Sequence, residues 1–582
     1  MYKPNYDKFP SIKLDGQIWT GWGSIRKVIE QKINDSGKQN ITLAIECYHG
    51  VNLKELKQGF SILKPALLVD TKEVFLPEEK ILHITYNDVT DDDIFGFMTR
   101  LSYSDILDKD KVSLARKDIG STNGLVIVLG YAASLICQKP DILVYADMPR
   151  WEIQLRQRKH QINNIGINNF EEAPALQYKR SFFVDWRICD KQKKAVLPNI
   201  DFWLDTVKEN SPKMITGNTM LKGLETTAKR PFRVMPFFDP GPWGGQWMKN
   251  ICGLDKETNN YAWCFDCVPE ENSLLFEIQG EIFELPSINL VFKEPTRLLG
   301  APVESRFGRE FPIRFDLLDT MQGGNLSLQV HPLTEYIREN FGIPYTQDES
   351  YYLLDAGTGA SVFLGVKTGI QPQEMINDLI RAQNGDFLFD AEKYINKFPA
   401  KKHDHFLIPN GTIHCSGANS MVLEISATPY IFTFKLWDWN RLGLDGKPRP
   451  INIKHGVNVI QWNRNTEFCR EELVCKIEKI GEGDGWVEER TGLHENEFIE
   501  TRRHWFTKKV EHSTGNGVNV LNLIEGREAV VESPDNSFEP FIVHYAETFI
   551  VPASVGKYTI RPYGESEGKQ CGTIKAYIRF KN

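Results

Sequence analysis

Four side chains in the second half of the chain have the chemistry needed to bind a metal ion. Gln329 and His331 lie two residues apart in Leu-Ser-Leu-Gln-Val-His-Pro, a segment typical of a β-strand. Because successive strand side chains alternate between faces, both are expected to point to the same side. Glu349 lies in a second strand-like run, and His414 ends Pro-Asn-Gly-Thr-Ile-His. Gln-x-His alone is also compatible with an ordinary strand. The prediction of a metal site therefore depends on the two downstream residues as well.

Together these four residues supply two imidazoles, one carboxylate and one amide oxygen. Such a mixed set of nitrogen and oxygen ligands suits a divalent first-row metal with an open coordination position. A single carboxylate leaves residual positive charge on the ion, so an oxygen bound there would be polarised. The sequence therefore predicts a Lewis-acidic metal site.

Motifs around these residues, taken in their order, resemble those of type I mannose-6-phosphate isomerases, a family of zinc-dependent cupin enzymes. The resemblance covers roughly residues 231–582 and rests on Pro242-Trp243-Gly244-Gly245, residues 326–332, the Glu349 strand, residues 409–414, Val422-Leu423-Glu424-Ile425 and residues 437–441. It implies zinc bound by Gln329, His331, Glu349 and His414. It also implies that the chain interconverts mannose 6-phosphate and fructose 6-phosphate or a related sugar phosphate.

The same resemblance implies roles for three further residues. Ser327 matches the family's serine beside the metal motif, which helps to hold the substrate phosphate. Lys435 lies where the family has its catalytic arginine and is expected to offset developing negative charge. Glu424 is a candidate for proton transfer or for supporting the metal ligands. Ser327 and Glu424 are equally compatible with ordinary strand positions, so that alternative stays open.

Several positions depart from the family pattern. Asp316 and Gln347 stand where family members typically have lysines. Lys435 keeps a positive charge but lacks the planar fork with which arginine binds two oxygens. A non-catalytic cupin that binds a sugar or sugar phosphate is therefore an alternative to the isomerase.

The pattern of apolar residues changes near residue 230. Before it, strand-like runs at 41–45, 124–129 and 141–145 alternate with helical segments such as 51–59 and 151–158, which predicts a parallel sheet covered by helices. After it, short β-branched and aromatic runs predict antiparallel sheets. We therefore expect a multi-domain α/β plus all-β chain. Its domains would be an α/β domain at 1–230, a metal-binding cupin at 231–455 with a helical insert at 371–397, and a C-terminal cupin-like β domain at 456–582. Within the insert, residues 373–382 and 390–397 are predicted to be helices.

Residues 1–230 resemble a degenerate, uridine-kinase-like P-loop domain. The first strand leads through Glu46-Cys47-Tyr48-His49-Gly50 into a helix, and Arg150, Arg156 and Arg158 resemble an arginine-bearing lid. These arginines are equally typical of ion pairs on a solvated helix face. A working P-loop requires Gly-x4-Gly-Lys-Ser/Thr, which this sequence lacks. A bifunctional sugar kinase–isomerase is therefore the least favoured alternative.

The overall composition narrows the class of protein. Hydrophobic residues at 41% and charged residues at 25% are ordinary for a globular protein, and a net charge of −8 argues against a nucleic-acid partner. No apolar run approaches the ~20 residues of a membrane helix, and the N-terminus lacks the apolar core of a signal peptide. A cytoplasmic location without membrane partners is the expectation, and the sequence carries no signal for an oligomeric state.

Ten cysteines are too few for a disulfide scaffold, so Cys264 and Cys267 are predicted to be reduced thiols.

Overall fold

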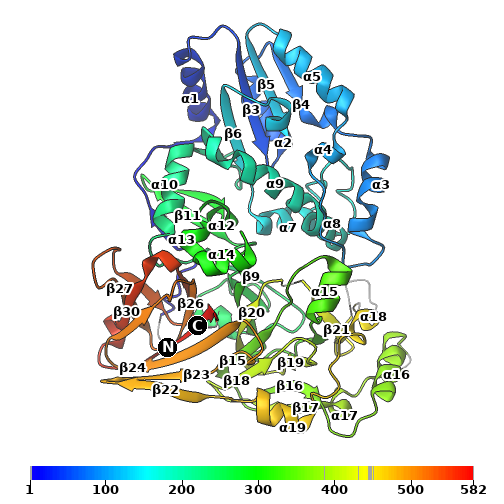
Figure 1. Cartoon of the computed structure of the whole chain (residues 1–582), viewed down its shortest axis with the longest axis vertical. Helices are drawn as coiled ribbons and strands as arrows, with labels where there is room; N and C mark the ends of the chain where they lie inside the picture. The colour runs from blue at the N-terminus through cyan, green and yellow to red at the C-terminus, as the bar shows by residue number, and fades with distance from the viewer. Residues whose placement is uncertain (1–2, 386, 430, 443–448, 450, 581–582) are drawn as a thin grey trace. The chain divides into compact units, whose positions relative to one another are not determined.

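The computed structural model describes residues 3–580 except 386, 430, 443–448 and 450, and it divides into two compact units (Figure 1). The N-terminal unit comprises residues 11–227 and 269–294. The β-rich unit comprises residues 1–10, 228–268 and 295–582. This division differs from the three modules expected from the sequence. Residues 269–294 join the N-terminal unit because β1 (Ser11–Lys13) pairs in parallel with β11 (Ser273–Ile278), which forms a hairpin with β12 (Glu281–Pro286).

A seven-stranded sheet forms the centre of the N-terminal unit. Its order is β2 (Ile18–Thr20), β8 (Lys213–Thr216), β7 (Phe202–Asp205), β6 (Ile142–Asp147), β3 (Ile41–Cys47), β5 (Leu125–Gly130) and β4 (Leu67–Asp70). The strands from β7 to β4 are parallel, whereas β8 pairs in antiparallel fashion with both β7 and β2. The three strands predicted in this region correspond to β3, β5 and β6. Their nearly continuous apolar runs are typical of parallel strands covered on both faces.

Helices flank this sheet, as α1 and α5 do in Figure 1. They are α1 (Gly21–Asp35), α2 (Leu53–Ser61), α3 (Glu78–Val89), α4 (Tyr103–Ile106), α5 (Lys109–Ser121), α6 (Ala133–Ile136), α7 (Arg150–Arg158), α8 (Pro174–Arg180), α9 (Trp186–Val196), α10 (Gly217–Thr227) and α12 (Ile288–Lys293). The helical segments predicted at 51–59 and 151–158 correspond to α2 and α7. The sequence pattern therefore located both helices to within about two residues.

Two of the α7 arginines have structural partners inside the N-terminal unit. Arg150 is buried and pairs with Asp190 at 2.6 Å, and its guanidinium lies over the ring of Trp186. Arg156 is buried and pairs with Glu152 at 2.8 Å. The alternative that these two arginines form solvated ion pairs is therefore wrong, because both guanidinium groups are enclosed by the fold.

Two antiparallel sheets carry the predicted metal ligands in the β-rich unit. The first has the order β18 (His405–Ile408), β15 (Glu349–Ala356), β20 (Ser420–Ala427), β13 (Ile313–Asp319), β10 (Trp263–Cys267) and β9 (Phe237–Asp239). The second has the order β17 (Ile395–Pro399), β16 (Ser361–Val366), β19 (His414–Ser416), β14 (Leu328–Val330) and β21 (Phe434–Trp437). Antiparallel sheets were predicted here, and the structure contains them.

Residues 478–578 form two further antiparallel sheets. One has the order β22 (Glu478–Gly483), β23 (Trp486–Arg490), β24 (Ile499–Phe506), β31 (Cys571–Ile578), β26 (Asn519–Glu525) and β29 (Thr548–Val551). The other has the order β25 (Val510–Ser513), β30 (Lys557–Pro562), β27 (Glu528–Glu532) and β28 (Phe541–His544). Strands of both sheets contribute to one apolar core, in which Leu521 and Phe549 join Val531 and Ile560.

The helical insert agrees only in part with its prediction. Helix α16 (Pro372–Gln383) matches the predicted helix at 373–382. The helix predicted at 390–397 is wrong beyond its first turn, because α17 (Ala391–Tyr394) gives way to strand β17, which pairs with β16. The remaining helices of the β-rich unit are α11 (Trp247–Ile251), α13 (Pro295–Leu299), α14 (Ala301–Phe307), α15 (Thr334–Phe341), α18 (Ile453–Gly456) and α19 (Thr466–Phe468).

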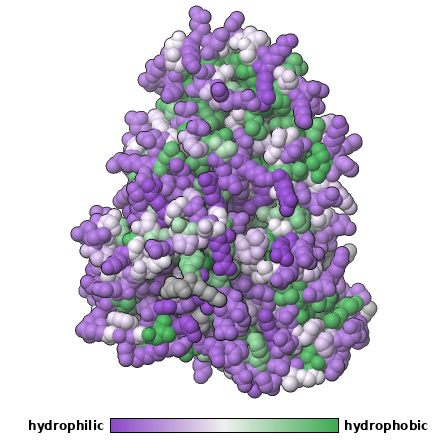
Figure 2. All heavy atoms as spheres, in the orientation of Figure 1, coloured by the Kyte–Doolittle hydropathy of each residue, from purple (hydrophilic) through white to green (hydrophobic). Residues whose placement is uncertain are grey.

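Surface and thiol properties agree with the composition. Hydrophilic residues dominate the face shown in Figure 2. Within the described residues, no helix is both long and apolar enough to cross a membrane. All ten cysteines are free, and Cys264 and Cys267 are both buried on β10, so their prediction as reduced thiols is confirmed.

A half-buried carboxyl group in the N-terminal unit makes its stability dependent on pH. Burial and the nearby charge of Asp205 raise the pKa of Glu284 to about 7, although the Ser273 hydroxyl and Lys213 favour its ionised form. A raised folded-state pKa means that the folded unit holds this proton more tightly than the unfolded chain. Stability is then greatest below the unfolded pKa of ~4.3 and falls as pH rises to about 7, by on the order of 1–3 kcal/mol.

We expect Glu284→Gln to remove this pH dependence, because the amide resembles the protonated acid and its oxygen still accepts from Ser273 Oγ, 2.6 Å away in the native chain. Thermal unfolding of the variant and the native chain should coincide near pH 4.5, and the variant should be more stable at pH 8. A stability difference of the same size at both pH values would contradict this prediction.

Candidate functional site

Three of the four predicted metal ligands converge in the β-rich unit. His331 directly follows β14, Glu349 begins β15 and His414 begins β19. Their ligand atoms lie within 4.8 Å of one another, and all three side chains are buried. Nε2 of His331 lies 3.1 Å from Glu349 Oε2, and Nε2 of His414 lies 2.7 Å from Glu349 Oε1. The two sheets therefore bring together residues that are up to 83 positions apart in the sequence.

Backbone carbonyls orient both imidazoles toward the centre of this cluster. His331 Nδ1 lies 3.1 Å from the carbonyl oxygen of Phe432, and His414 Nδ1 lies 2.8 Å from that of Thr412. A carbonyl can only accept a hydrogen bond, so each Nδ1 carries the proton and each Nε2 keeps a lone pair for a metal. This arrangement is usual for histidines that bind metal ions.

The donor set fits a divalent cation. His331 Nε2 and Glu349 Oε1 are buried and have no hydrogen-bond partner among the described residues. A buried carboxylate and two inward-facing imidazole nitrogens are costly without a partner, and a cation at their centre would satisfy all three.

Gln329 reaches the same cluster from β14. It is the register partner of His414, and its side-chain Nε2 lies 3.2 Å from His414 Nε2. The oxygen and nitrogen of the Gln329 amide exchange places when the amide group turns by half a revolution. In that orientation the oxygen faces the cluster. Gln329 and His331 share a face of the strand, as alternation predicts, while Val330 is fully buried.

Beside the cluster lies a cavity of about 190 Å³, which we call the site cavity. Its lining includes Trp243, Ser327, Gln329, Gln347, Glu424 and Lys435. The site cavity thus borders Gln329 of the ligand cluster and the three residues predicted to act on substrate.

Glu424 lies on β20 among charged neighbours that the sequence did not reveal. Its carboxylate pairs with the buried guanidinium of Arg314, which also binds Asp316 at 3.0 Å. Burial and the charge of Glu349 raise the pKa of Glu424 well above its usual range, although Arg314 opposes this shift. Gln347 connects the two glutamates, donating to Glu349 Oε2 at 2.8 Å and to Glu424 Oε1 at 3.3 Å.

Lys435 lies on β21 as a register partner of Gln329. Burial and the nearby Arg449 lower the pKa of Lys435 to about 8, although Asp438 opposes this shift. Its ammonium group has no hydrogen-bond or ion-pair partner among the described residues. It is therefore a cation at the site cavity that remains available to an incoming anion.

Ser327 lines the site cavity, but its hydroxyl is already engaged. It donates to Asp438 Oδ1 at 2.6 Å. Asp438 also pairs with Arg441 and with Arg449, the latter at 2.9 Å. The Ser327 oxygen can still accept a hydrogen bond, but its proton is committed to Asp438.

Arg314 is a site-cavity residue that sequence reasoning missed. The available signal was its spacing, because Arg314 and Asp316 lie two residues apart on one strand and therefore share a face. Two further buried acceptors line the cavity without a hydrogen-bond partner among the described residues, Asp316 Oδ1 and Gln347 Oε1. Unpartnered buried acceptors are rare in proteins, and here they point to a donor-rich ligand.

Comparisons with known proteins find two kinds of similarity. A family model described as a domain of unknown function (DUF8485) matches residues 21–229. The mannose-6-phosphate isomerase of Streptococcus mutans is 26% identical over 220 residues, which are 38% of this chain and 64% of that enzyme. The aligned part thus spans less than two thirds of that relative. The match at 21–229 gives no support to the kinase-like interpretation of residues 1–230.

Longer alignments show lower identity. A putative mannose-6-phosphate isomerase of Bacillus subtilis is 21% identical over 342 residues, covering 57% of this chain and 96% of that protein. The crystal structure of the mannose 6-phosphate isomerase from Bacillus subtilis covers 60% of this chain and 99% of that chain, with 21% identity and a TM-score of 0.48. The chain is thus similar in sequence to proteins named mannose-6-phosphate isomerase.

Proposed function

We propose that the chain is a metal-dependent aldose–ketose isomerase that interconverts mannose 6-phosphate and fructose 6-phosphate or a related sugar phosphate. The observation that carries this proposal is the buried cluster of His331, Glu349 and His414, with its unpartnered ligand atoms beside a cavity containing Lys435. Similarity to proteins named mannose-6-phosphate isomerase supports it.

Zinc, or another divalent first-row metal, would be held by His331, Glu349, His414 and the amide oxygen of Gln329. When bound there it would act as a Lewis acid that polarises the carbonyl and hydroxyl oxygens of the sugar. Gln347 fixes one oxygen of Glu349 by donating to it, so this ligand would be held in a single orientation.

The residues of the chain supply the remaining parts of the reaction. Glu424 lines the site cavity and is proposed to move a proton between C1 and C2, with Arg314 fixing the direction of its carboxylate. Lys435 would donate toward the negative charge that develops on the sugar oxygen. Asp316 Oδ1 and Gln347 Oε1 would accept hydrogen bonds from sugar hydroxyls, since neither has a partner in the described residues.

A non-catalytic sugar-binding protein is the second candidate. It is favoured by the ion pairs of Arg314 with Asp316 and Glu424, because a phosphate would have to compete with these carboxylates for the guanidinium. A coupled isomerase assay of zinc-loaded protein with a panel of sugar phosphates separates the two candidates. We expect turnover of mannose 6-phosphate or a close relative. Saturable binding of a panel member without turnover would favour the second candidate and refute the isomerase.

A further inference from the structure

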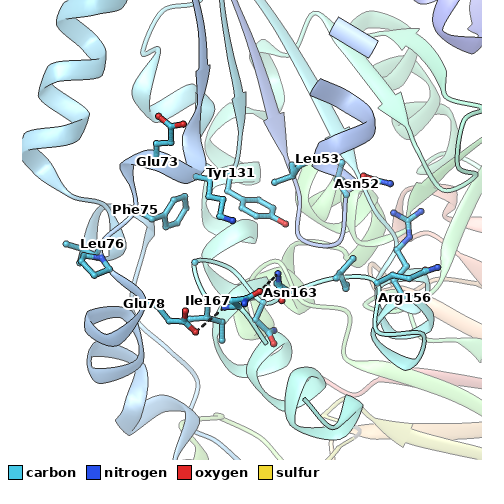
Figure 3. Close-up of a pocket in the computed structure, with 18 of the residues that line it drawn as sticks. Asn52, Leu53, Glu73, Phe75, Leu76, Glu78, Tyr131, Arg156, Asn163 and Ile167 are labelled. Atoms are coloured by element: carbon cyan, nitrogen blue, oxygen red, sulfur yellow. Dashed lines mark hydrogen bonds between the residues drawn. The ribbon is translucent and has the colours of Figure 1, made fainter. Parts of the chain in front are cut away.

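A second cavity lies within the N-terminal unit, far larger than the site cavity and unconnected with the proposed isomerase chemistry. It has a volume of about 720 Å³, within the range typical of small-molecule sites. We call it the sheet-edge cavity because its lining comes from segments that follow parallel strands. Asn52 follows β3, Phe75 follows β4, Tyr131 follows β5, and Ile167 lies beyond β6 (Figure 3).

This location is where open α/β sheets bind ligands. After β3 the chain crosses toward β4, at one edge of the sheet. After β6 it crosses to β7, in the opposite direction along the strand order. Because β3 and β6 are neighbours, the connections that follow them diverge, and this opens a crevice at the carboxyl ends of the two strands. The sheet-edge cavity is therefore a candidate ligand site on grounds of topology as well as volume.

The cations and the helix terminus of this cavity are poorly suited to a phosphate. All of the Arg156 guanidinium nitrogens are occupied, by Glu152 and by the carbonyl oxygens of Gly50, Thr206 and Val207. The N-terminus of α2 is capped by the Asn52 side chain, which accepts from the backbone N–H of the third helical residue at 3.1 Å. An anion would find neither a free guanidinium nor an open helix end.

The remaining charges on the lining also disfavour an anion. Lys72 and Lys111 are exposed to solvent, and three carboxylates that are also exposed, those of Glu73, Glu78 and Glu209, outnumber them. Carboxylates accept hydrogen bonds, so they suit a ligand rich in hydroxyl or amide protons.

An aromatic ring is held in the cavity by a strained loop. Figure 3 shows the Tyr131 side chain facing Ile167 and Asn163. Ala132, the next residue, adopts a left-handed conformation with φ of 63°, which costs a non-glycine residue about 1–2 kcal/mol. The buried carboxylate of Glu46 holds this loop by accepting from the Ala132 N–H at 2.8 Å. A ring presented in this way offers a flat apolar face and a hydroxyl group.

The loop that carries Ile167, opposite Tyr131, is also held by a hydrogen-bond network. Asn164 is buried and its amide donates to the carbonyl oxygen of Gln177, to Ser181 and to Asp185, the last at 2.6 Å. This network fixes the loop that carries Ile167. Apolar side chains and polar groups thus face one another across a preformed space, the composition expected of a small-molecule site.

We propose that the sheet-edge cavity binds an uncharged ring compound bearing several hydroxyl groups, such as a free monosaccharide or a nucleoside. The ring packs between Tyr131, Phe75 and Ile167. Its hydroxyls donate to the carboxylates of the lining and accept from the Nδ2 protons of Asn52, which have no acceptor among the described residues.

Isothermal titration of the full chain tests this proposal. The probes are free mannose, glucose and fructose, their 6-phosphates, and uridine and adenosine, each titrated in the presence of a chelator so that the metal cluster does not contribute. We assign to the sheet-edge cavity only the binding that variants of its lining weaken. At that cavity we expect at least one uncharged probe to bind, and to bind more tightly than its phosphorylated form. Comparison of the hexoses with the nucleosides then shows which of these two classes of compound the cavity binds.

Two variants locate the binding. Ile167→Trp should fill the cavity and weaken binding at least tenfold. Tyr131→Phe should weaken it about five- to tenfold by removing one hydroxyl and leaving the ring. Leu114→Trp, at an exposed position of α5 outside the lining, is the matched control and should bind normally.

Three results would overturn the proposal. They are the absence of binding by every uncharged probe, tighter binding of a phosphorylated probe that Tyr131→Phe weakens, and unchanged binding of the uncharged probes in Tyr131→Phe. Each can be reached even if Ile167→Trp does not fold, because Tyr131→Phe alters only one oxygen. None of them bears on the isomerase proposal, which concerns the β-rich unit.

Discussion

His414→Ala is expected to abolish stoichiometric metal binding and to reduce sugar-phosphate isomerisation by roughly 10²–10⁴-fold, the effect of losing a Lewis acid worth several kcal/mol. The physical reason is the geometry of the cluster. His414 Nε2 lies 2.7 Å from Glu349, and its Nδ1 is held by the Thr412 carbonyl, so no neighbouring group can replace it. Metal analysis of the purified protein and a coupled isomerase assay measure the two effects.

A thermal readout separates metal loss from misfolding. Zinc should raise the melting temperature of the native chain, because an ion that binds only the folded state stabilises it, and should leave His414→Ala unchanged. His83→Ala is the matched control, since His83 is exposed on α3. A His414→Ala protein that still binds one equivalent of zinc and turns over at the native rate would refute the assignment of this ligand.

Lys435→Met is expected to lower kcat/KM for the sugar phosphate by roughly 10²–10³-fold, the usual cost of removing a charged donor to a developing oxyanion. Lys435 is half-buried near Arg449, lines the site cavity, and has no carboxylate holding its ammonium group in the described residues. Lys435→Arg should recover part of the loss, because it restores the charge on a longer, planar group.

Metal content distinguishes this effect from damage to the cluster. Lys435→Met should bind zinc as the native chain does, because the side chain is not among the clustered ligand atoms. Lys454→Met is the control, since Lys454 is exposed on α18. Native kcat/KM in Lys435→Met would exclude Lys435 from the reaction and would leave the sugar-binding alternative in the stronger position.

Local sequence patterns predicted the elements that carry the site. Alternation in a strand predicted that Gln329 and His331 share a face, and the buried runs of β3, β5 and β6 predicted a parallel sheet. Such patterns are readable because strand geometry repeats every two residues and so depends only on near neighbours. The helix predicted at 390–397 was wrong because pairing with β16 overrides a local helical preference.

The sequence by itself determined the types of the candidate ligands, their order and the segments that bear them. The tertiary structure alone decided what surrounds them: the engagement of Arg314 by two carboxylates, the bond from Ser327 to Asp438, and the joining of β11 to β1. Three of these contacts link residues that are distant in the sequence. The fourth, between Arg314 and Asp316, is local, but it belongs to the same ion-pair cluster as the distant Glu424. Their pairing is set by burial and register across sheets, which no local pattern of residues encodes.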